Sequence, residues 1–336
     1  MRPVEIVGGG LAGLGLGIAL RGHGVPVTIH EAGHYPRHRV CGEFITSLDD
    51  ETQKALRLER VLCGALRAHG VTWHEDGKAD ITHRLPHPAL CLSRHRLDAC
   101  MADTFSDLGG ELRTGSRVAC EDRPGRVMAC GRLPDASSPW VGIKQHYREL
   151  EAFNDLEVHF SPAGYIGLAR VDGQTTNVCG LLRRGSCDLR ASFHEIAAAA
   201  GFRDLGRRLA TAQAVRDSFC AVAALDYKRP AISDDSLRVG DRSALIPPFT
   251  GHGMTIALQS STTVVPSLLA WSRGEARWEQ AKSAAARRQR RRFASRIRAA
   301  RTLLPFLLDA RARHLARTLH RRGLLPVGLM YRLMHR

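Results

Sequence analysis

The sequence predicts a mixed α/β fold in which a parallel-sheet domain carries an inserted antiparallel sheet and a helical C-terminal tail. Three observations lead to this prediction. Near the N-terminus, a short apolar run is followed by a glycine-rich turn and a helix-forming segment. From residue 141 to 182, apolar residues alternate along the chain and β-branched residues are frequent. After residue 272, arginine is concentrated in a helical pattern.

The composition excludes several classes of protein. The 336 residues, enough for about two domains, are 44% hydrophobic and 24% charged, so wholesale disorder and a fibrous architecture are excluded. The nine cysteines are odd in number and have no Cys-x-x-Cys spacing, so we expect neither a disulfide framework nor a metal site. We expect no signal peptide, because an acid interrupts the first apolar residues, and we find no apolar run of the ~18 residues that span a membrane. We therefore expect a cytoplasmic location.

The N-terminal 31 residues predict a strand–turn–helix–strand unit. Residues 3–7 and 25–31 are β-like, and residues 14–21 are rich in helix formers. The turn between the first strand and the helix has the spacing Gly-x-Gly-x-x-Gly, with an acid at the end of the second strand. This pattern is typical of Rossmann units, in which the helix N-terminus binds a pyrophosphate and the acid binds ribose. The predicted dinucleotide-binding residues are Gly8, Gly10, Leu11, Ala12, Gly13 and Glu31.

A second glycine-bearing segment favours FAD over NAD. A short strand ends at Gly240-Asp241, a proline-rich loop follows, and Gly251-x-Gly253 opens a helix at Met254. This segment resembles the second FAD fingerprint of the flavoprotein hydroxylases with the p-hydroxybenzoate hydroxylase fold. The resemblance implies that Asp241 binds the ribityl chain and that residues 248–254, beginning with Pro248, lie against the flavin ring. The expected fold is therefore a Rossmann-type FAD-binding domain with an inserted antiparallel-sheet domain.

Two further segments extend the resemblance. Leu92-Ser93-Arg94 opens a helix and looks like the place where this family directs an arginine at the FAD pyrophosphate. Residues 35–44, with Arg39 and the sequence Cys41-Gly42-Glu43, are similar to the Cys-Gly-Glu loop of geranylgeranyl reductase-like flavoproteins. That likeness implies that Arg39 contacts FAD and that Cys41 and Gly42 face the flavin. From their positions, the candidate catalytic residues are Cys41, Glu43 and His252.

The predicted substrate sheet carries three polar candidates. Lys144, His146 and Tyr165 lie in segments that resemble the strands under the substrate in the same subfamily, although ordinary polar residues on a half-exposed strand fit the pattern equally well. The chain also departs from the family: Cys130-Gly131 replaces the usual Asp-Gly. The Trp-x-Trp-x-Ile-Pro signature of flavin-dependent halogenases is missing, which disfavours halogenation.

The motifs predict three parts of the chain. The FAD-binding domain would consist of residues 1–70, 91–135 and 226–272. The substrate domain would consist of residues 71–90 and 136–225. Helices are expected over 51–70, 97–108, 190–212, 255–271 and 275–301. Residues 273–336 would form a basic helical tail.

The resemblance implies an FAD-dependent oxidoreductase acting on a hydrophobic, isoprenoid- or polyketide-like substrate. The reaction expected from the Arg39–Glu43 segment is reduction or dehydrogenation at a C=C bond. The alternative is aromatic hydroxylation with O2, and a second alternative is a non-catalytic basic binding module. No separate NAD(P)H domain is visible, so NAD(P)H is expected only as a transient electron donor.

The tail concentrates the positive charge. Residues 273–336 hold 18 Lys and Arg against 3 Asp and Glu, which accounts for nearly all of the formal net charge of +16. Apolar residues lie among the arginines, a combination that suits an anionic membrane surface. A helix packed on the body with a solvated far side fits as well. Nucleic acid is disfavoured as a partner because no recognition motif accompanies the charge.

Overall fold

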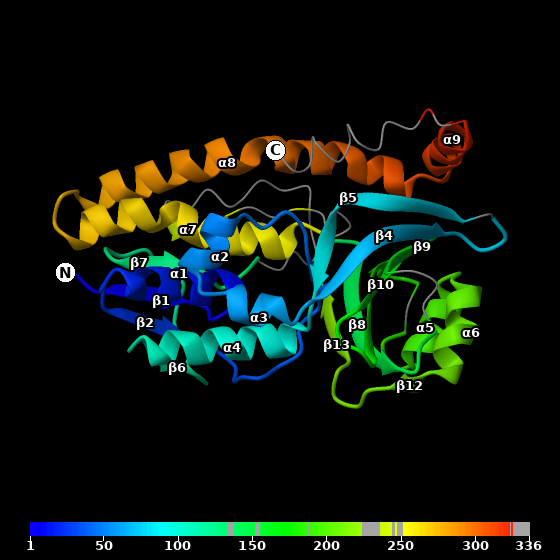
Figure 1. Ribbon diagram of the computed structural model, residues 1–336, viewed down its shortest axis with the longest axis horizontal. Coiled ribbons are helices and arrows are strands. Elements are labelled where there is room, and N and C mark those ends of the chain that lie inside the picture. The colour runs from blue at the N-terminus through cyan, green and yellow to red at the C-terminus, as the bar shows by residue number, and fades with distance from the viewer. Residues whose placement is uncertain are drawn as a thin grey trace.

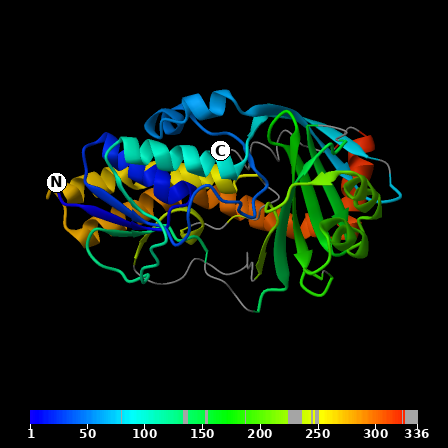
Figure 2. The same cartoon turned by 90° about the horizontal axis from the view of Figure 1, so that it is seen from below.

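A computed structural model of the chain describes most of the sequence. The described residues are 1–78, 80–132, 137–151, 155–186, 188–223, 236–243, 246, 251–322 and 324, with the backbone alone at 303–308. They form two lobes side by side, each built on one sheet, and long C-terminal helices run along both (Figure 1). Figure 2 shows the two sheets at opposite ends of the molecule.

The first lobe is a five-stranded sheet in which every neighbouring pair is parallel. Its strands in spatial order are β14 (Leu237–Arg238), β7 (Arg126–Met128), β1 (Val4–Val7), β2 (Val27–His30) and β6 (Glu111–Arg113). The helices that pack with it are α1 (Leu11–Gly22), α4 (Arg94–Asp107) and α7 (Gly253–Ser272). The predicted β1–α1–β2 unit is therefore present, and α1 is buried over almost its whole length because it lies between α4 and α7.

The second lobe is a nine-stranded sheet. Its strands in spatial order are β12 (Gln213–Ala214), β8 (Trp140–Arg148), β11 (Thr175–Arg183), β10 (Gly164–Arg170), β9 (Leu156–Ser161), β4 (Leu66–His74), β5 (Ile81–Cys91) and β3 (Phe44–Ile45), and β13 (Cys220–Ala223) also pairs with β8. The helices α5 (Phe193–Ala199) and α6 (Arg203–Thr211) cover one face of it.

The predicted antiparallel sheet is confirmed with one correction, because β4 pairs with β9 in parallel. All the other pairs in this sheet are antiparallel. A parallel pair requires a long connection between the two strands, and the long segment that includes α4 and β6 to β8 supplies it.

The predicted helix over 51–70 is wrong in its second half. Two short helices, α2 (Asp50–Ala55) and α3 (Glu59–Cys63), are followed by β4 from Leu66. Residues 66–70 become a strand because β5 pairs with them, a partner that the local sequence does not reveal. The predicted helix over 190–212 is likewise divided into α5 and α6 at Gly201, whose φ of +89° ends the first helix.

The tail packs on the body. The helix α8 (Trp278–Leu308) runs beside α7, and α9 (Ala310–Arg321) lies near β4 and β5 (Figure 1). Arg292 pairs with Asp49 at 2.9 Å, and both Arg313 and Arg317 pair with Glu75 at 3.3 Å. These contacts support the packed alternative, while lipid binding by the exposed face stays a prediction. In the part of the chain described, no helix is long and apolar enough to cross a membrane.

Candidate functional site: a cavity shared by the two sheets

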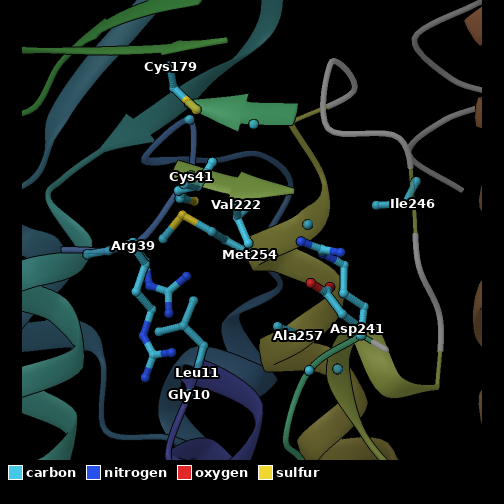
Figure 3. A pocket seen from close by; sticks show the side chains of 18 of the residues that line it. Gly10, Leu11, Arg39, Cys41, Cys179, Val222, Asp241, Ile246, Met254 and Ala257 are labelled. Carbon is cyan, nitrogen blue, oxygen red and sulfur yellow. The ribbon is translucent and has the colours of Figure 1, made fainter. Parts of the chain in front are cut away.

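One cavity of about 1220 Å³ is lined from both lobes, and Figure 3 shows its centre. Gly10 and Leu11 lie at one end of the view, Asp241 on another side, and Cys41 with Cys179 at the opposite end. The two glycine-bearing segments thus meet at one cavity although they are far apart in the sequence. The predicted cofactor-binding residues that line it are Gly8, Gly10, Leu11, Ala12, Glu31, Arg39, Arg94, Gly240, Asp241, Gly251, Gly253 and Met254.

The glycine turn has little room for side chains at two of its three positions. A Cβ on Gly8 would lie 2.5 Å from the carbonyl oxygen of Ala129, and Gly8 has a φ of +109°. A Cβ on Gly13, which packs beneath the turn, would lie 1.9 Å from the carbonyl oxygen of Gly8. At Gly10 a Cβ would meet nothing within 4 Å and would stand beside the cavity. At this turn, main-chain atoms that no side chain covers therefore form part of the cavity wall.

The start of α1 is suited to an anion. Gly10 is its N-cap, no side chain caps the helix, and its first turn contains no acid. Unbonded N–H groups and the positive end of the helix dipole therefore remain at the cavity. A dinucleotide pyrophosphate fits this arrangement.

Glu31 stabilises the Gly8–Gly13 turn. Its carboxylate accepts hydrogen bonds from the N–H groups of Gly9 and Gly33, both at 2.8 Å, and pairs with Arg37 at 2.8 Å. Burial by itself would raise the pKa of Glu31, but the Gly33 N–H and the guanidinium groups of Arg39 and Arg37 lower it. Glu31 is therefore a carboxylate that fixes the turn and also lines the cavity.

Two arginines share one buried acid beside the cavity. Arg94 binds both oxygens of Asp98, at 2.6 and 2.8 Å, and Arg39 donates to Asp98 at 3.1 Å. Asp98 is completely buried, and Arg39 also pairs with Glu31 at 3.4 Å. With Arg37, three guanidinium groups therefore face two carboxylates, and the group carries one net positive charge. The sequence prediction missed Asp98, although an acid four residues after an arginine on a helix is a recognisable signal.

The second glycine segment places an acid opposite these arginines. Asp241 follows Gly240, whose φ is +64°, and faces the cavity from the side opposite Arg39 (Figure 3). The enclosing protein raises the pKa of the Asp241 carboxyl, and Arg94 counteracts this effect. Gly253 and Met254 at the start of α7 also line the cavity. Pro248 lies outside the described residues.

The nine-stranded sheet supplies a largely apolar wall. Tyr165, a predicted substrate residue, lines the cavity with other side chains from the sheet, which include Trp73, Leu156, Leu168, Leu181 and Val222. Cys41 lines it from the loop before β3, and burial raises the pKa of its thiol. The thiol is therefore neutral, and this half of the cavity fits a hydrophobic ligand.

Five of the predicted site residues that the structure describes do not line the cavity, and Gly13, beneath the glycine turn, is one of them. His252 is completely buried as the N-cap residue of α7. Glu43, Lys144 and His146 are buried between the residue 37–43 loop and the sheet, with 2.6 Å between His146 Nε2 and Glu43 Oε2 and 3.5 Å between Lys144 Nζ and Glu43 Oε1. Lys144 is also 2.9 Å from His38 Nδ1, and His38, which the sequence prediction missed, does line the cavity.

A second buried cluster lies in the same sheet. Ligand atoms of His74, Glu157 and His159 lie within 4.8 Å of one another, close enough for a metal ion. Arg208, however, binds both oxygens of Glu157, at 2.8 and 3.2 Å. Because the guanidinium already balances the carboxylate, we assign the cluster as a buried ion-pair network.

The complete fold resembles that of several solved structures. The flavin-dependent brominase Bmp2 aligns with a TM-score of 0.78 at 16% identity, covering 99% of this chain and 93% of that one. PqsL of P. aeruginosa, solved with 2-aminobenzoylacetate, aligns with a TM-score of 0.71 at 14% identity, covering 93% and 98%. A geranylgeranyl bacteriochlorophyll reductase-like protein of Thermoplasma acidophilum aligns with a TM-score of 0.71 at 16% identity, covering 91% and 87%. The predicted fold class is therefore confirmed.

The remaining comparisons give no assignment. No protein-family model matches the chain, and no curated protein matches it either.

Proposed function

We propose that this chain is an FAD-dependent oxidoreductase that acts on a hydrophobic small molecule. The single observation that carries the proposal is the joint cavity, where the Gly8–Gly13 turn and the segment from Gly240 to Met254 meet. The fold similarity to flavin-dependent enzymes supports the same conclusion. The cavity exceeds the ~300–1000 Å³ of common small-molecule sites, which leaves room for a substrate beside a dinucleotide.

The residues of the cavity fit FAD in their chemistry. The uncapped start of α1 at Gly10 would receive the pyrophosphate. The group of Arg37, Arg39 and Arg94 with Glu31 and Asp98, which is net positive, would partly balance its charge. Asp241, which lines the cavity, would accept hydrogen bonds from ribityl hydroxyls. When bound, FAD supplies the capacity to accept or donate an electron pair. The protein contributes binding, orientation and exclusion of water.

The reaction we propose is reduction or dehydrogenation at a C=C bond. The apolar sheet wall suits an isoprenoid- or polyketide-like substrate, and the resemblance of the Arg39–Glu43 loop to geranylgeranyl reductase-like proteins favours this branch. NAD(P)H would reduce the enzyme transiently. Aromatic hydroxylation with O2 is the second candidate, because the segment from Gly240 to Met254 resembles the second FAD fingerprint of the flavoprotein hydroxylases. The two reactions differ in their need for oxygen.

A valine at Gly10 tests the cofactor proposal. A side chain here meets no protein atom but projects beside the cavity, so the Gly10→Val variant should fold and lose FAD. Gly22→Val is the matched control, because Gly22 lies at the other end of α1 with equally open space. The measurements are the visible absorption of the purified proteins and an FAD titration. Equal FAD binding by both variants would refute the proposed site.

Oxygen separates the two reactions. The reduced enzyme is mixed anaerobically with candidate isoprenoids and aromatic compounds, and products are identified by mass spectrometry. A product with two more hydrogens that forms without oxygen supports the reductase. A product that carries an added oxygen atom and forms only in air supports the hydroxylase.

A further inference from the structure

His38 joins a buried charge network to the cavity. The residue lines the cavity, and its Nδ1 lies 2.9 Å from Nζ of Lys144. Lys144 is completely buried and lies 3.5 Å from Glu43, which is also completely buried. His146 Nε2 completes the network at 2.6 Å from the other oxygen of Glu43.

The sheet register explains why Lys144 faces the cavity side. In β8 it lies directly opposite Cys179 of β11 and Cys220 of β13, and both cysteines line the cavity. Residues directly opposite each other in antiparallel strands project from the same face. Lys144 therefore points toward the cavity, and the loop that carries His38 lies over it. Asn177 helps to hold this loop by donating to the carbonyl oxygen of Cys41 at 2.9 Å.

Charge balance determines which groups are ionised. Burial would raise the pKa of Glu43, but His146, Lys144 and the N–H of Arg94 lower it, so Glu43 is a carboxylate. A buried carboxylate needs a buried cation, and Lys144 is in place to supply it. Burial and the neighbouring Lys144 lower the pKa of His38 to about 4, so its ring is neutral at pH 7. Because an ammonium group only donates, Nδ1 must accept and the ring proton must reside on Nε2.

We propose that His38 is a proton donor to the cavity, held in the Nε2–H tautomer by the buried Lys144–Glu43 pair. In the step, the Nε2–H bond breaks as a proton passes to an anionic atom in the cavity. A proton of Lys144 moves to Nδ1 in the same step, and Lys144 becomes neutral. After the product leaves, Nε2 takes a proton from water and Nδ1 returns its proton to Lys144. The net change is one proton taken from water, with no oxidation or reduction of the protein.

This assignment rests on the proposed function for its use, because reduction of a C=C bond by hydride transfer needs one further proton. The arrangement resembles a general acid whose tautomer is fixed by a second group. His95, stacked on His38 with ring centroids 4.5 Å apart, limits rotation of the ring.

Nitrogen NMR of the full chain with ¹⁵N-labelled histidine tests the tautomer. The signals of His38 are identified by their loss in His38→Gln. Between pH 6 and 8, we expect wild-type His38 to remain neutral with the proton on Nε2, and Lys144→Met to show a mixture of the two tautomers. A proton on Nδ1 in the wild type, or signals unchanged in Lys144→Met, would overturn the proposal. This measurement does not require FAD, so it stands even if the proposed function fails.

Proton delivery is tested with oxygen as the probe. Oxidation of the photoreduced holoenzyme by O2 forms hydrogen peroxide and takes up protons, so it is followed by stopped-flow absorbance in H2O and D2O. We expect His38→Phe to slow this oxidation at least about tenfold and to lose the solvent isotope effect. The matched control is His83→Phe, because His83 also lines the cavity but is not bonded to Lys144. Equal rates and isotope effects in His38→Phe and the wild type would refute the role of His38.

Discussion

The two walls of the cavity are built in different ways. Among the described residues of the five-stranded side, six glycines line it: Gly8, Gly10, Gly131, Gly240, Gly251 and Gly253. On the nine-stranded side, Gly142, Gly167 and Gly180 also line it, but large side chains such as Trp73, Tyr165 and Leu181 stand beside them. We call the five-stranded side the backbone wall and the nine-stranded side the side-chain wall. Main-chain atoms bind the pyrophosphate that many nucleotides share, whereas large side chains select a ligand by its shape. Mutations in the two walls should therefore separate the binding of the cofactor from the choice of substrate.

The largest loss of stability is expected from a substitution at Gly13, which packs beneath the backbone wall. In Gly13→Val, the new Cβ would lie 1.9 Å from the carbonyl oxygen of Gly8, and a helix packed between two others has no room to move. We expect a loss of about 4 kcal/mol or more in the free energy of unfolding, or no folded protein. Thermal and urea denaturation measure it. A stable Gly13→Val protein would show that the turn tolerates side chains, and the contrast between the two walls would then be smaller than we propose.

A buried ion pair stabilises the side-chain wall, and the pH dependence of this stabilisation can be predicted. Glu157 in β9 is completely buried against Arg208, and its pKa is lowered to about 2 although burial alone would raise it. Because the folded-state pKa is below the ordinary value, this stabilisation is complete above pH 4.5 and is lost as the pH falls from 4.5 towards 2.

Glu157→Gln removes this pH-dependent contribution, which amounts to roughly 3 kcal/mol at neutral pH. Urea denaturation of the wild type and the variant at pH 7, 4 and 3 should show their difference in stability shrinking as the pH falls. A difference that does not change with pH would contradict the predicted ion pair. FAD affinity should stay within about twofold, because the ion pair lies in the other wall from the glycine turn.

A smaller loss of stability is expected from a substitution at the edge of the side-chain wall. Val222 in β13 is only partly buried and lines the cavity, so Val222→Ala should cost less than about 1 kcal/mol of stability and widen the cavity. FAD titration should give an unchanged affinity, while longer or bulkier substrates gain relative to smaller ones in product assays. A parallel loss of FAD would indicate that the two walls do not act separately.

The smallest effect on the cavity should come from the outer face of α8. Arg287, Arg290 and Arg291 are exposed there. Changing all three to Glu should leave FAD content and stability unaltered, because these side chains lie on the solvent side. If the tail binds anionic membranes, co-sedimentation with phosphatidylserine vesicles should fall by at least about tenfold, at roughly 1 kcal/mol for each arginine. Binding that is equal in both proteins would argue against this face as a lipid site.

Local patterns predicted more of the backbone wall than of the side-chain wall. The turn around Gly8 and Gly10, the acid Glu31 and the helix after Gly253 could be recognised because each depends on neighbours in the chain. The strand at residues 66–70 could not, since its conformation depends on pairing with β5. His38 was missed for the same reason, because nothing near it in the sequence points to Lys144.

The sequence by itself determined the β1–α1–β2 unit, the order of the two glycine segments and the basic character of the tail, because these follow from spacing and local conformation. Only the tertiary structure decided that Gly10 and Asp241 share one cavity, that Glu43, Lys144 and His146 form a buried group behind His38, and that α8 and α9 pack on the body. The physical reason is that burial and charge pairing depend on contacts between residues far apart in the chain, which the folded backbone creates.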